Sequence, residues 1–389
     1  MGFLLCCCKK KNTFCQWASE IGTLKGQSLS KQALFERTTA AAASFASMLL
    51  QHVIRRQLRL KSEVFKGFNK VLLQDSTTLK LPDKLASYFP GNITKGIQKA
   101  IARIQCVMNL QTLEFLQFSL KSFRDNDQSA SADVLNILSK GDLLIRDLGY
   151  FSLKTFKRII SRQAYFLSRL RFGVKLYDVS GQPLDWKVLL KSRKTIDKMV
   201  LIGKKEKIPM RLVMLPLPAG QTAARVRKAR RDRDGRLNHS KQYYQWLGYS
   251  VFITNVSEEV WTSHHVQAAY KTRWQIEIIF KSWKSGFNLQ HILHDGCTNG
   301  NRVKLNIYLL LLFICLFMQK IYIPYKEAIE NQNNKTLSLI KLSAYVCFNL
   351  IAVVTLPPRQ LKEELIRHCC YEKRNDRINM TDLIKYFKN

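Results

Sequence analysis

The chain has 389 residues and a formal charge of +35, from 63 Lys and Arg against 28 Asp and Glu. Its hydrophobic content of 46% is that of a globular protein and argues against a disordered one. The ten cysteines include no CxxC pair with a partner at zinc-finger spacing, which argues against a zinc module and favours free thiols in a reducing, cytoplasmic setting. The charge favours a phosphate backbone as partner through counterion release. A membrane surface, or no nucleic-acid role at all, are the alternatives.

Residues 1–65 predict a helical N-terminal region. Ser28 or Ser30 is a candidate cap for a helix that runs on to Val53, and the basic residues Arg55 and Arg56 follow it. This region is interpreted either as a small DNA-contacting domain or as a solvated helical lobe.

Residues 66–164 predict strands, two of which carry an acid. Asp75 closes a short apolar run whose strand-like alternation continues until Pro82 stops it. Ser131 is a candidate helix cap, and Asp147 ends a buried-type strand just before Gly149 breaks it. The expected order is three strands, a helix and a fourth strand, at residues 71–81, 101–110, 114–120, 133–138 and 143–147.

Residues 165–255 read as a β-strand-rich insertion with one basic helical run. The strand candidates are short and separated by Gly, Pro and charged turns, at 174–177, 188–190, 199–202, 210–217 and 251–254. The run from Arg225 to Arg236 has seven Lys or Arg in twelve positions, diluted by Asp232 and Asp234. We interpret it as a surface that tracks phosphates, with an ordinary solvated face as the alternative. Its candidate contacts are Arg225, Arg227, Lys228, Arg230 and Arg231.

The segment 270–284, within residues 256–320, predicts an amphipathic helix with an unusual polar stripe. At about 100° per residue, one acid and its polar neighbours fall within about 80° of one another. These residues are Tyr270, Arg273, Glu277, Lys281 and Lys284. A lone carboxylate among cations suits a group that holds a metal ion beside a polyanion.

The C-terminal region contains the longest apolar run, Ile307–Met318, and then a mostly helical tail over 321–389. Twelve residues are fewer than the roughly 20 needed to cross a bilayer, so a buried helix and no membrane partner are expected. The tail is expected to be interrupted at Pro357–Pro358.

Three acids stand out by position: Asp75, Asp147 and Glu277. Carboxylate oxygens on rigid elements suit Mg²⁺ or Mn²⁺, and two such ions about 3.5–4 Å apart can support an in-line phosphoryl transfer. Taken singly, Asp75 is an ordinary turn acid, and Asp142 is an alternative to Asp147 that precedes its strand instead of closing it. Only the three acids together favour a metal site.

The spacing Tyr270-x2-Arg273-x3-Glu277-x6-Lys284 resembles the Y-R-E-K signature of the DDE transposases of the insertion sequence 4 family. Gln74-Asp75-Ser76-Thr77 resembles that family's first Asp motif, and Asp147-Leu148-Gly149-Tyr150-Phe151 resembles its second. The resemblance spans roughly residues 71–294.

The resemblance implies an α/β fold, with a ribonuclease-H-like mixed sheet flanked by helices and interrupted by the β-rich insertion. It implies cut-and-paste transposition with two divalent ions, and a homodimer bound to double-stranded transposon ends and target DNA. Asp75, Asp147 and Glu277 become metal ligands, while Tyr270, Arg273 and Lys284 become phosphate contacts. The alternative function is a non-catalytic DNA-binding relative that regulates transposition, against which the intact acids argue.

Some members of that family flip a base onto an aromatic side chain. Trp246 and Tyr249 lie where such a residue would fall in this chain. Packing in the core of the insertion is the favoured interpretation of both, because large aromatic side chains mostly serve packing.

Overall fold

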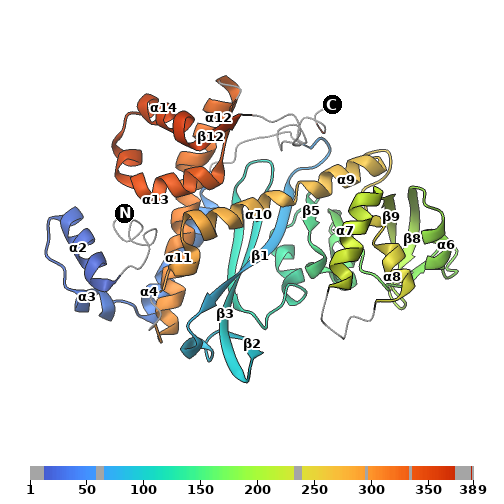
Figure 1. The fold of residues 1–389 in the computed structure, drawn as a ribbon, viewed down its shortest axis with the longest axis horizontal. Coiled ribbons are helices and arrows are strands. Elements are labelled where there is room, and N and C mark those ends of the chain that lie inside the picture. Colours follow the sequence, from blue (N-terminus) through green and yellow to red (C-terminus); the bar gives the residue numbers. More distant parts are fainter. Residues whose placement is uncertain are drawn as a thin grey trace. The chain divides into compact units, whose positions relative to one another are not determined.

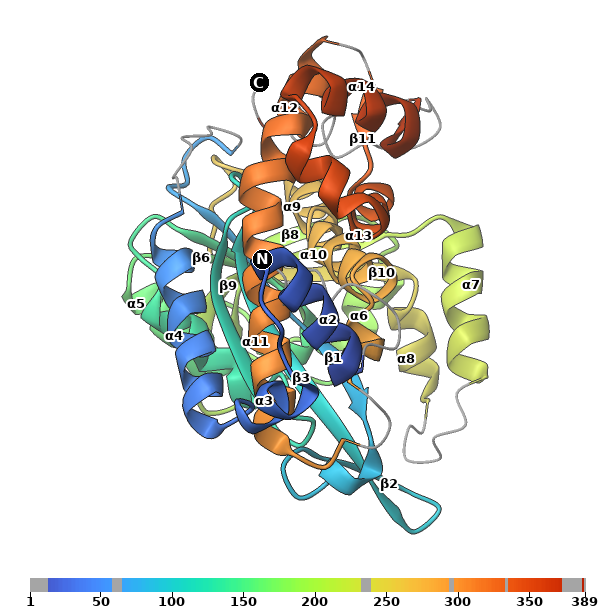
Figure 2. The ribbon, with the colours of Figure 1, turned by 90° about the vertical axis from the view of Figure 1, so that its left-hand side faces the viewer.

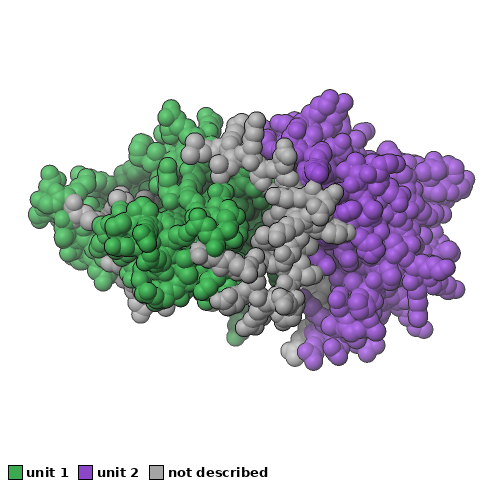
Figure 3. Space-filling model, turned by 90° about the horizontal axis from the view of Figure 1, so that it is seen from above, with its two compact units in different colours: residues 1–62, 75–126, 274–379 green, residues 63–74, 127–273, 380–389 purple. Residues whose placement is uncertain are grey.

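The computed structural model describes residues 13–57, 65–231, 239–293, 297–332, 335–372 and 387. The chain forms two compact units (Figure 3). Unit 1 contains residues 1–62, 75–126 and 274–379, and unit 2 contains residues 63–74, 127–273 and 380–389. Strand β1 (Val71–Leu81) therefore begins in unit 2 and ends in unit 1.

The N-terminal part of unit 1 is helical, as predicted, with α2 (Phe14–Lys25), α3 (Lys31–Glu36) and α4 (Ala40–Arg55). Ser30 caps α3 by accepting the Ala33 N–H at 3.1 Å. The single helix expected from there to Val53 is wrong, because Thr39 caps a new helix by accepting the Ala42 N–H. Small residues of α4, Ala43 and Ala46, pack on α11 (Gly300–Phe317).

The sheet of unit 1 contains the second half of β1 with β2 (Pro90–Thr94), β3 (Ile97–Asn109) and β4 (Phe115–Ser122). Strand β3 lies beside β1 and pairs antiparallel with β2 and then β4. The strands predicted at 71–81, 101–110 and 114–120 are confirmed. The short strand β2 was not predicted, since Pro90 and Gly91 are poor strand formers.

In unit 2, the first half of β1 pairs parallel with β5 (Leu143–Arg146), which pairs parallel with β6 (Tyr165–Arg169). The sheet continues antiparallel through β10 (Tyr249–Thr254), β9 (Ile208–Pro216), β8 (Ile196–Ile202) and β7 (Leu176–Tyr177). Because β1 belongs to both units, the strand order β4–β3–β1–β5–β6 follows, which is that of a ribonuclease-H-like sheet. The predicted fold class is confirmed.

The described part of 165–255 contains three helices as well as five strands. They are α6 (Trp186–Lys191), α7 (Ala219–Arg230) and α8 (Lys241–Trp246). The strand expected at 188–190 is wrong, because those residues belong to α6. Asp185 caps this helix by accepting the Lys187 N–H at 2.8 Å, and Trp186, Leu189 and Leu190 are buried at helical spacing.

The remaining elements are mostly helical (Figure 1). In chain order, they are η1 (Asp83–Leu85), η2 (Ser129–Asn136), η3 (Leu148–Tyr150), α5 (Leu153–Ser161), α9 (Ser263–Lys271), α10 (Trp274–Lys281), η4 (Ser282–Gly286), η5 (Leu289–His291), η6 (Met318–Tyr322), α12 (Ile323–Gln332), β11 (Lys335–Leu337), α13 (Leu339–Thr355), α14 (Pro358–Cys369) and β12 (Cys370–Glu372). The helix expected at 133–138 is a 3-10 helix, η2, that begins four residues earlier. The interruption expected at Pro357–Pro358 is confirmed, since α13 ends at Thr355 and α14 begins at Pro358.

The apolar run Ile307–Met318 forms most of α11 and the first residue of η6, and it is largely buried, as predicted. The helical stretch that contains it, Gly300–Gln332, is long and apolar enough to cross a membrane by length and composition alone. More than half of its most apolar window is buried inside the protein, as in the core helix of a globular fold.

Candidate functional site

The signature segment 270–284 is not one regular α-helix, so the single straight stripe expected there is wrong. Helix α9 ends at Lys271, and the Arg273 N–H bonds to the Tyr270 carbonyl at 3.2 Å, a tightened turn. The Thr272 hydroxyl also donates to the Ala269 carbonyl at 2.6 Å, which competes with the regular ladder.

A wide turn follows the tight one. Residues Ser282–Gly286 form a π-helical turn, closed by a 3.0 Å bond from the Phe287 N–H to the Ser282 carbonyl. This turn changes the angular position of Lys284 relative to Glu277. The segment is also divided between the two units, with Tyr270 and Arg273 in unit 2 and Glu277, Lys281 and Lys284 in unit 1.

In unit 2, two signature side chains converge on Asp147. Asp147 follows β5 directly, and the Tyr270 hydroxyl donates to its Oδ1 at 3.3 Å. Arg273 Nε lies 3.8 Å from the same oxygen. The Asp147 side chain is 42% exposed and that of Arg273 is 14% exposed, so the carboxylate faces solvent while the guanidinium is largely enclosed.

A third cation lies beside this cluster. The Arg169 guanidinium lies 5.7 Å from the centroid of the Tyr270 ring, as close as that of Arg273, at 5.8 Å. Burial, and then the charge of Asp147, raise the pKa of Tyr270, so its hydroxyl keeps its proton near neutral pH. The result is one exposed carboxylate with a guanidinium and a phenol beside it, and a second guanidinium over the phenol ring, a combination that suits a phosphate.

Sequence reasoning missed Arg169, although a signal was present. Strands β5 and β6 are parallel, and their register pairs Arg146 with Ser168. The next residues, Asp147 directly after β5 and Arg169 at the end of β6, therefore lie at the carboxyl ends of adjacent parallel strands, where functional side chains of α/β sheets gather.

Arg146, which precedes Asp147 in the chain, forms a closed polar network. The side chain of Arg146 is 0% exposed. Its guanidinium donates to the Gln74 Oε1 at 2.8 Å, the Ser131 Oγ at 2.8 Å, the Ser131 carbonyl at 2.6 Å and the Tyr150 carbonyl at 3.3 Å. Burial lowers the pKa of Arg146 to about 9, and the network keeps most of its donors paired.

This network ties together the segments that carry two of the predicted acids. Gln74 and Arg146 are register partners on β1 and β5, and they immediately precede Asp75 and Asp147. Ser131, expected to cap a helix, is instead a buried member of the network. In the sequence, this network is indicated by the polar residues Gln74 and Arg146, which each end an apolar run.

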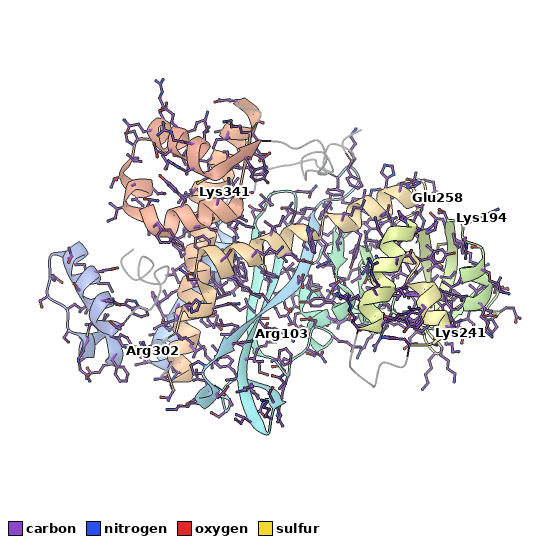
Figure 4. The ribbon with its side chains drawn as sticks, in the orientation of Figure 1. Arg103, Lys194, Lys241, Glu258, Arg302 and Lys341 are labelled. Atoms are coloured by element: carbon purple, nitrogen blue, oxygen red, sulfur yellow. The ribbon has the colours of Figure 1, made fainter. Side chains whose placement is uncertain are left out.

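In unit 1, Asp75 lies in the middle of β1. The Ser76 N–H donates to its Oδ1 at 2.8 Å, and Arg103 on β3 (Figure 4) donates to the Ser76 hydroxyl at 3.1 Å. Arg103 also lies 5.0 Å from the Phe123 ring centroid. The carboxylate is thus attached to a rigid, half-buried strand.

Glu277 lies in the first turn of α10, half-exposed, while Ile276, Ile279 and Phe280 bury the opposite face. Trp283 of the following turn packs on β4, 5.9 Å from the rings of Phe115 and Phe118.

Gly286 ends the π-turn where it meets α13. A Cβ at this position would lie 1.9 Å from the Ser343 hydroxyl oxygen, so the close approach requires glycine.

The two lysines of the signature segment differ in burial. Lys281 is exposed, with its Nζ 5.4 Å from the Trp274 ring centroid. Burial lowers the pKa of Lys284, which is half-buried.

The basic run divides into one inward residue and several outward ones. Arg225 donates to the Tyr249 carbonyl at 2.9 Å, and burial, then the charge of Arg169, lower its pKa. The exposed cations of the run are Arg227, Lys228, Arg230 and Arg231. Residues 232–238, which complete the run, lie outside the described part of the chain.

Trp246 and Tyr249 pack in the interior of unit 2, as favoured from the sequence. Trp246 lies 4.7 Å from the Trp186 ring, and the Tyr249 hydroxyl donates to the Leu190 carbonyl.

Asp142, the alternative to Asp147, has a structural role. It is buried and accepts hydrogen bonds from the Lys70 ammonium and the Ser139 N–H.

Carboxylates are the hard oxygen donors that Mg²⁺ and Mn²⁺ prefer, so the chemistry of Asp75, Asp147 and Glu277 fits these ions. Across the described ranges, however, no three or more His, Cys, Asp or Glu side chains form a group that could hold a metal ion. Asp147 belongs to unit 2, whereas Asp75 and Glu277 belong to unit 1.

Comparison with known proteins adds family information to this geometry. Residues 66–317 match the model of the transposase DDE domain family. The chain is 27% identical over 363 residues to the transposase for insertion sequence element IS231F of Bacillus thuringiensis subsp. israelensis, covering 86% of this chain and 75% of that protein. It is 26% identical to the transposase for IS1151 of Clostridium perfringens, covering 71% of this chain and 64% of that protein.

A solved structure is also similar at low identity. It is the cryo-EM structure of the piggyBac transposase synaptic complex with hairpin DNA, at 9% sequence identity and a TM-score of 0.40. The match covers 80% of this chain and 60% of that one.

Proposed function

This chain belongs to the DDE transposase family, and from that premise we propose that it moves an insertion sequence by metal-dependent cleavage and strand transfer. It is a DNA transposase, like the relatives it matches. The observation that supports a catalytic role best is the convergence of the signature residues Tyr270 and Arg273 on Asp147. This is the arrangement expected if the acid and its phosphate-binding neighbours act together.

We assign the ligand role to Asp75, Asp147 and Glu277, which would together hold two divalent ions. DDE transposases generally use such ions, which activate a water or a 3′-hydroxyl and stabilise the leaving oxygen. The strand β1 and the turn after β5 carry two of the acids on rigid backbone, and the Arg146 network holds the strand ends that precede them.

Arg273 lies beside the carboxylate of Asp147, and Arg169 lies over the ring of Tyr270, whose hydroxyl donates to that carboxylate. Both arginines are therefore proposed to bind the phosphate next to the scissile bond, with Tyr270 orienting the acid. Lys281 and Lys284 are proposed as phosphate contacts of unit 1, and the exposed cations of α7 as phosphate contacts of unit 2.

The proposed partner is double-stranded DNA, both the terminal inverted repeats of the element and the target. A homodimer on the paired ends, acting in the cytoplasm, is part of the same proposal. The charge of +35 supports a partner with a high density of phosphates.

The test is strand cleavage of a duplex that carries the element's own terminal repeat, with Mg²⁺, Mn²⁺ or Ca²⁺. The variants Asp75→Asn, Asp147→Asn and Glu277→Gln keep the size of each side chain and remove its charge. Each is expected to lose cleavage by about 10³-fold or more, since several kcal/mol of charge stabilisation disappear. Binding to the same duplex should remain within about threefold of wild type.

Asp185→Asn is the matched control, because Asn caps a helix as well as Asp does and this residue caps α6. It is expected to cleave like wild type. Normal cleavage by any one of the three acid variants removes that residue from the site. A wild-type chain that binds the ends but never cleaves them, with any of the three ions, supports a non-catalytic DNA-binding protein instead.

A further inference from the structure

The hairpin formed by β2 and β3 in unit 1 has an exposed tip that is both apolar and basic. Residues 92–97 are all exposed, with Ile93 at 66% and Ile97 at 54%. Lys95 and Gly96 make the turn, both with positive φ, at 50° and 76°. Figure 2 shows this hairpin extending past the other strands of its sheet.

The register places the two isoleucines on opposite faces of the ribbon. Thr94 pairs with Ile97, and Ile93 pairs with Gln98. Since side chains alternate between faces along a strand, Ile93 points to one face and Ile97 to the other. Large apolar side chains exposed on both faces contribute little to folding, and both are accessible to a partner.

The base of the hairpin is firmly attached to unit 1. Leu85, Phe89 and Ala100 are buried, and the Ile101 N–H donates to the Phe89 carbonyl at 2.9 Å. A Cβ on Gly91 would lie 2.8 Å from the Lys99 carbonyl oxygen, so the backbones of the two paired strands approach each other closely here. A firm base can present the tip to a partner without a large loss of conformational entropy.

The charge around the hairpin fits a polyanion. Residues 80–99 contain four lysines and a single acid, Asp83, which pairs with Lys99 at 2.7 Å. Lys80, Lys84 and Lys95 are exposed. A second copy of this strongly basic chain is disfavoured as the occupant by charge repulsion, whereas a phosphate backbone is complementary.

We propose that the β2–β3 hairpin enters a groove of double-stranded DNA, with Lys95 on the phosphates and Ile93 and Ile97 against the bases. Two-stranded ribbons fit DNA grooves, and apolar side chains inserted at base steps unstack them and kink the duplex. This inference rests on the proposed function, because it assigns one more contact to the same DNA.

The test uses the full-length chain in the Asp147→Asn background, so that the duplex stays uncut. The probes are the terminal-repeat duplex and an unrelated duplex, each with 2-aminopurine placed along it to report unstacking. The double variant Ile93→Ser/Ile97→Ser is expected to lose about tenfold in affinity. It should also lose the fluorescence increase, with the salt slope unchanged. Lys95→Ala is expected to reduce that slope by about one and to keep the fluorescence change.

Val188→Ser, on the exposed face of α6, is the control and should behave as wild type. This inference is overturned if the parent chain binds the duplex and all hairpin variants keep its affinity, its salt slope and its 2-aminopurine fluorescence change. The transposase function would still stand after that result. A change of sedimentation without a change in DNA binding shows that the tip contacts a second copy, which also overturns it. A chain with intact acids that neither binds nor cleaves its terminal repeat overturns the proposed function itself.

Discussion

Two arginines next to Asp147 show how placement decides what the same side chain does. Arg146, which precedes the acid in the chain, is fully buried, and its guanidinium donates to three residues of unit 2. Arg273 lies 3.8 Å from the Asp147 carboxylate, whose side chain is 42% exposed. The closed network stabilises the strand ends, whereas the open face leaves a cationic surface where a phosphate can bind. Substitutions in the two regions should therefore change different measurements.

The largest expected effect comes from Arg146→Met in the closed region. The apolar side chain leaves the Gln74 amide oxygen and the Ser131 and Tyr150 carbonyls without their shared donor. We expect a loss of roughly 3–5 kcal/mol in the free energy of unfolding, measured by urea denaturation. Arg227→Met, on the exposed face of α7, should cost less than about 0.5 kcal/mol. Equal losses in the two variants would contradict the comparison.

Arg273→Ala, in the open region, should weaken DNA binding and leave stability nearly unchanged. We expect about a tenfold loss of affinity for the terminal-repeat duplex and a salt slope reduced by about one, because one phosphate contact disappears. Binding is measured by fluorescence anisotropy from 50 to 200 mM salt. Arg225→Ala is the control, since this guanidinium donates to the Tyr249 carbonyl. The same change of slope in both variants would show that Arg225 also reaches DNA.

Lys228→Ala tests whether the exposed cations of α7 follow the phosphate backbone. We expect a loss of affinity of about threefold and a decrease of up to one in the salt slope, equal for specific and unrelated duplexes, because phosphate contacts carry no sequence information. The measurement is the same titration on both duplexes. No change of slope would leave α7 as a solvated surface helix.

Tyr270→Phe should have a modest effect near neutral pH and its most distinctive effect above pH 10. It removes the hydroxyl that donates to Asp147 at 3.3 Å, which costs about 0.5–1.5 kcal/mol of stability or catalysis. The pKa of Tyr270 is raised on folding, so the folded state favours the protonated phenol. That contribution is fully present below pH about 10 and is lost as pH rises through the higher pKa of the folded state. Unfolding midpoints above pH 10 should therefore fall less steeply in Tyr270→Phe than in wild type, and identical slopes would contradict this.

Much of the fold could be predicted because its signals are local. The apolar runs at 71–81, 101–110 and 143–147 become β1, β3 and β5, and Asp147 follows its strand directly, as expected. The strand expected at 188–190 failed because Asp185 is a good helix cap and three apolar residues repeat at helical spacing. The regular helix over 270–284 failed because of the Thr272 back-bond and the π-turn, which depend on packing.

By itself, the sequence determined the family signature and the candidate acids, through the spacing of Tyr270, Arg273 and Glu277 and through Asp75 and Asp147 at the ends of apolar runs. These are properties of short segments, and periodicity or chain order expresses them directly. Only the tertiary structure decided that Arg146 is buried behind Asp147, that Arg225 turns inward and that Arg169 joins Tyr270. The reason is physical: the partner of Arg146 on β1 is 72 residues away in the chain, and such a bond exists only once the strands have paired.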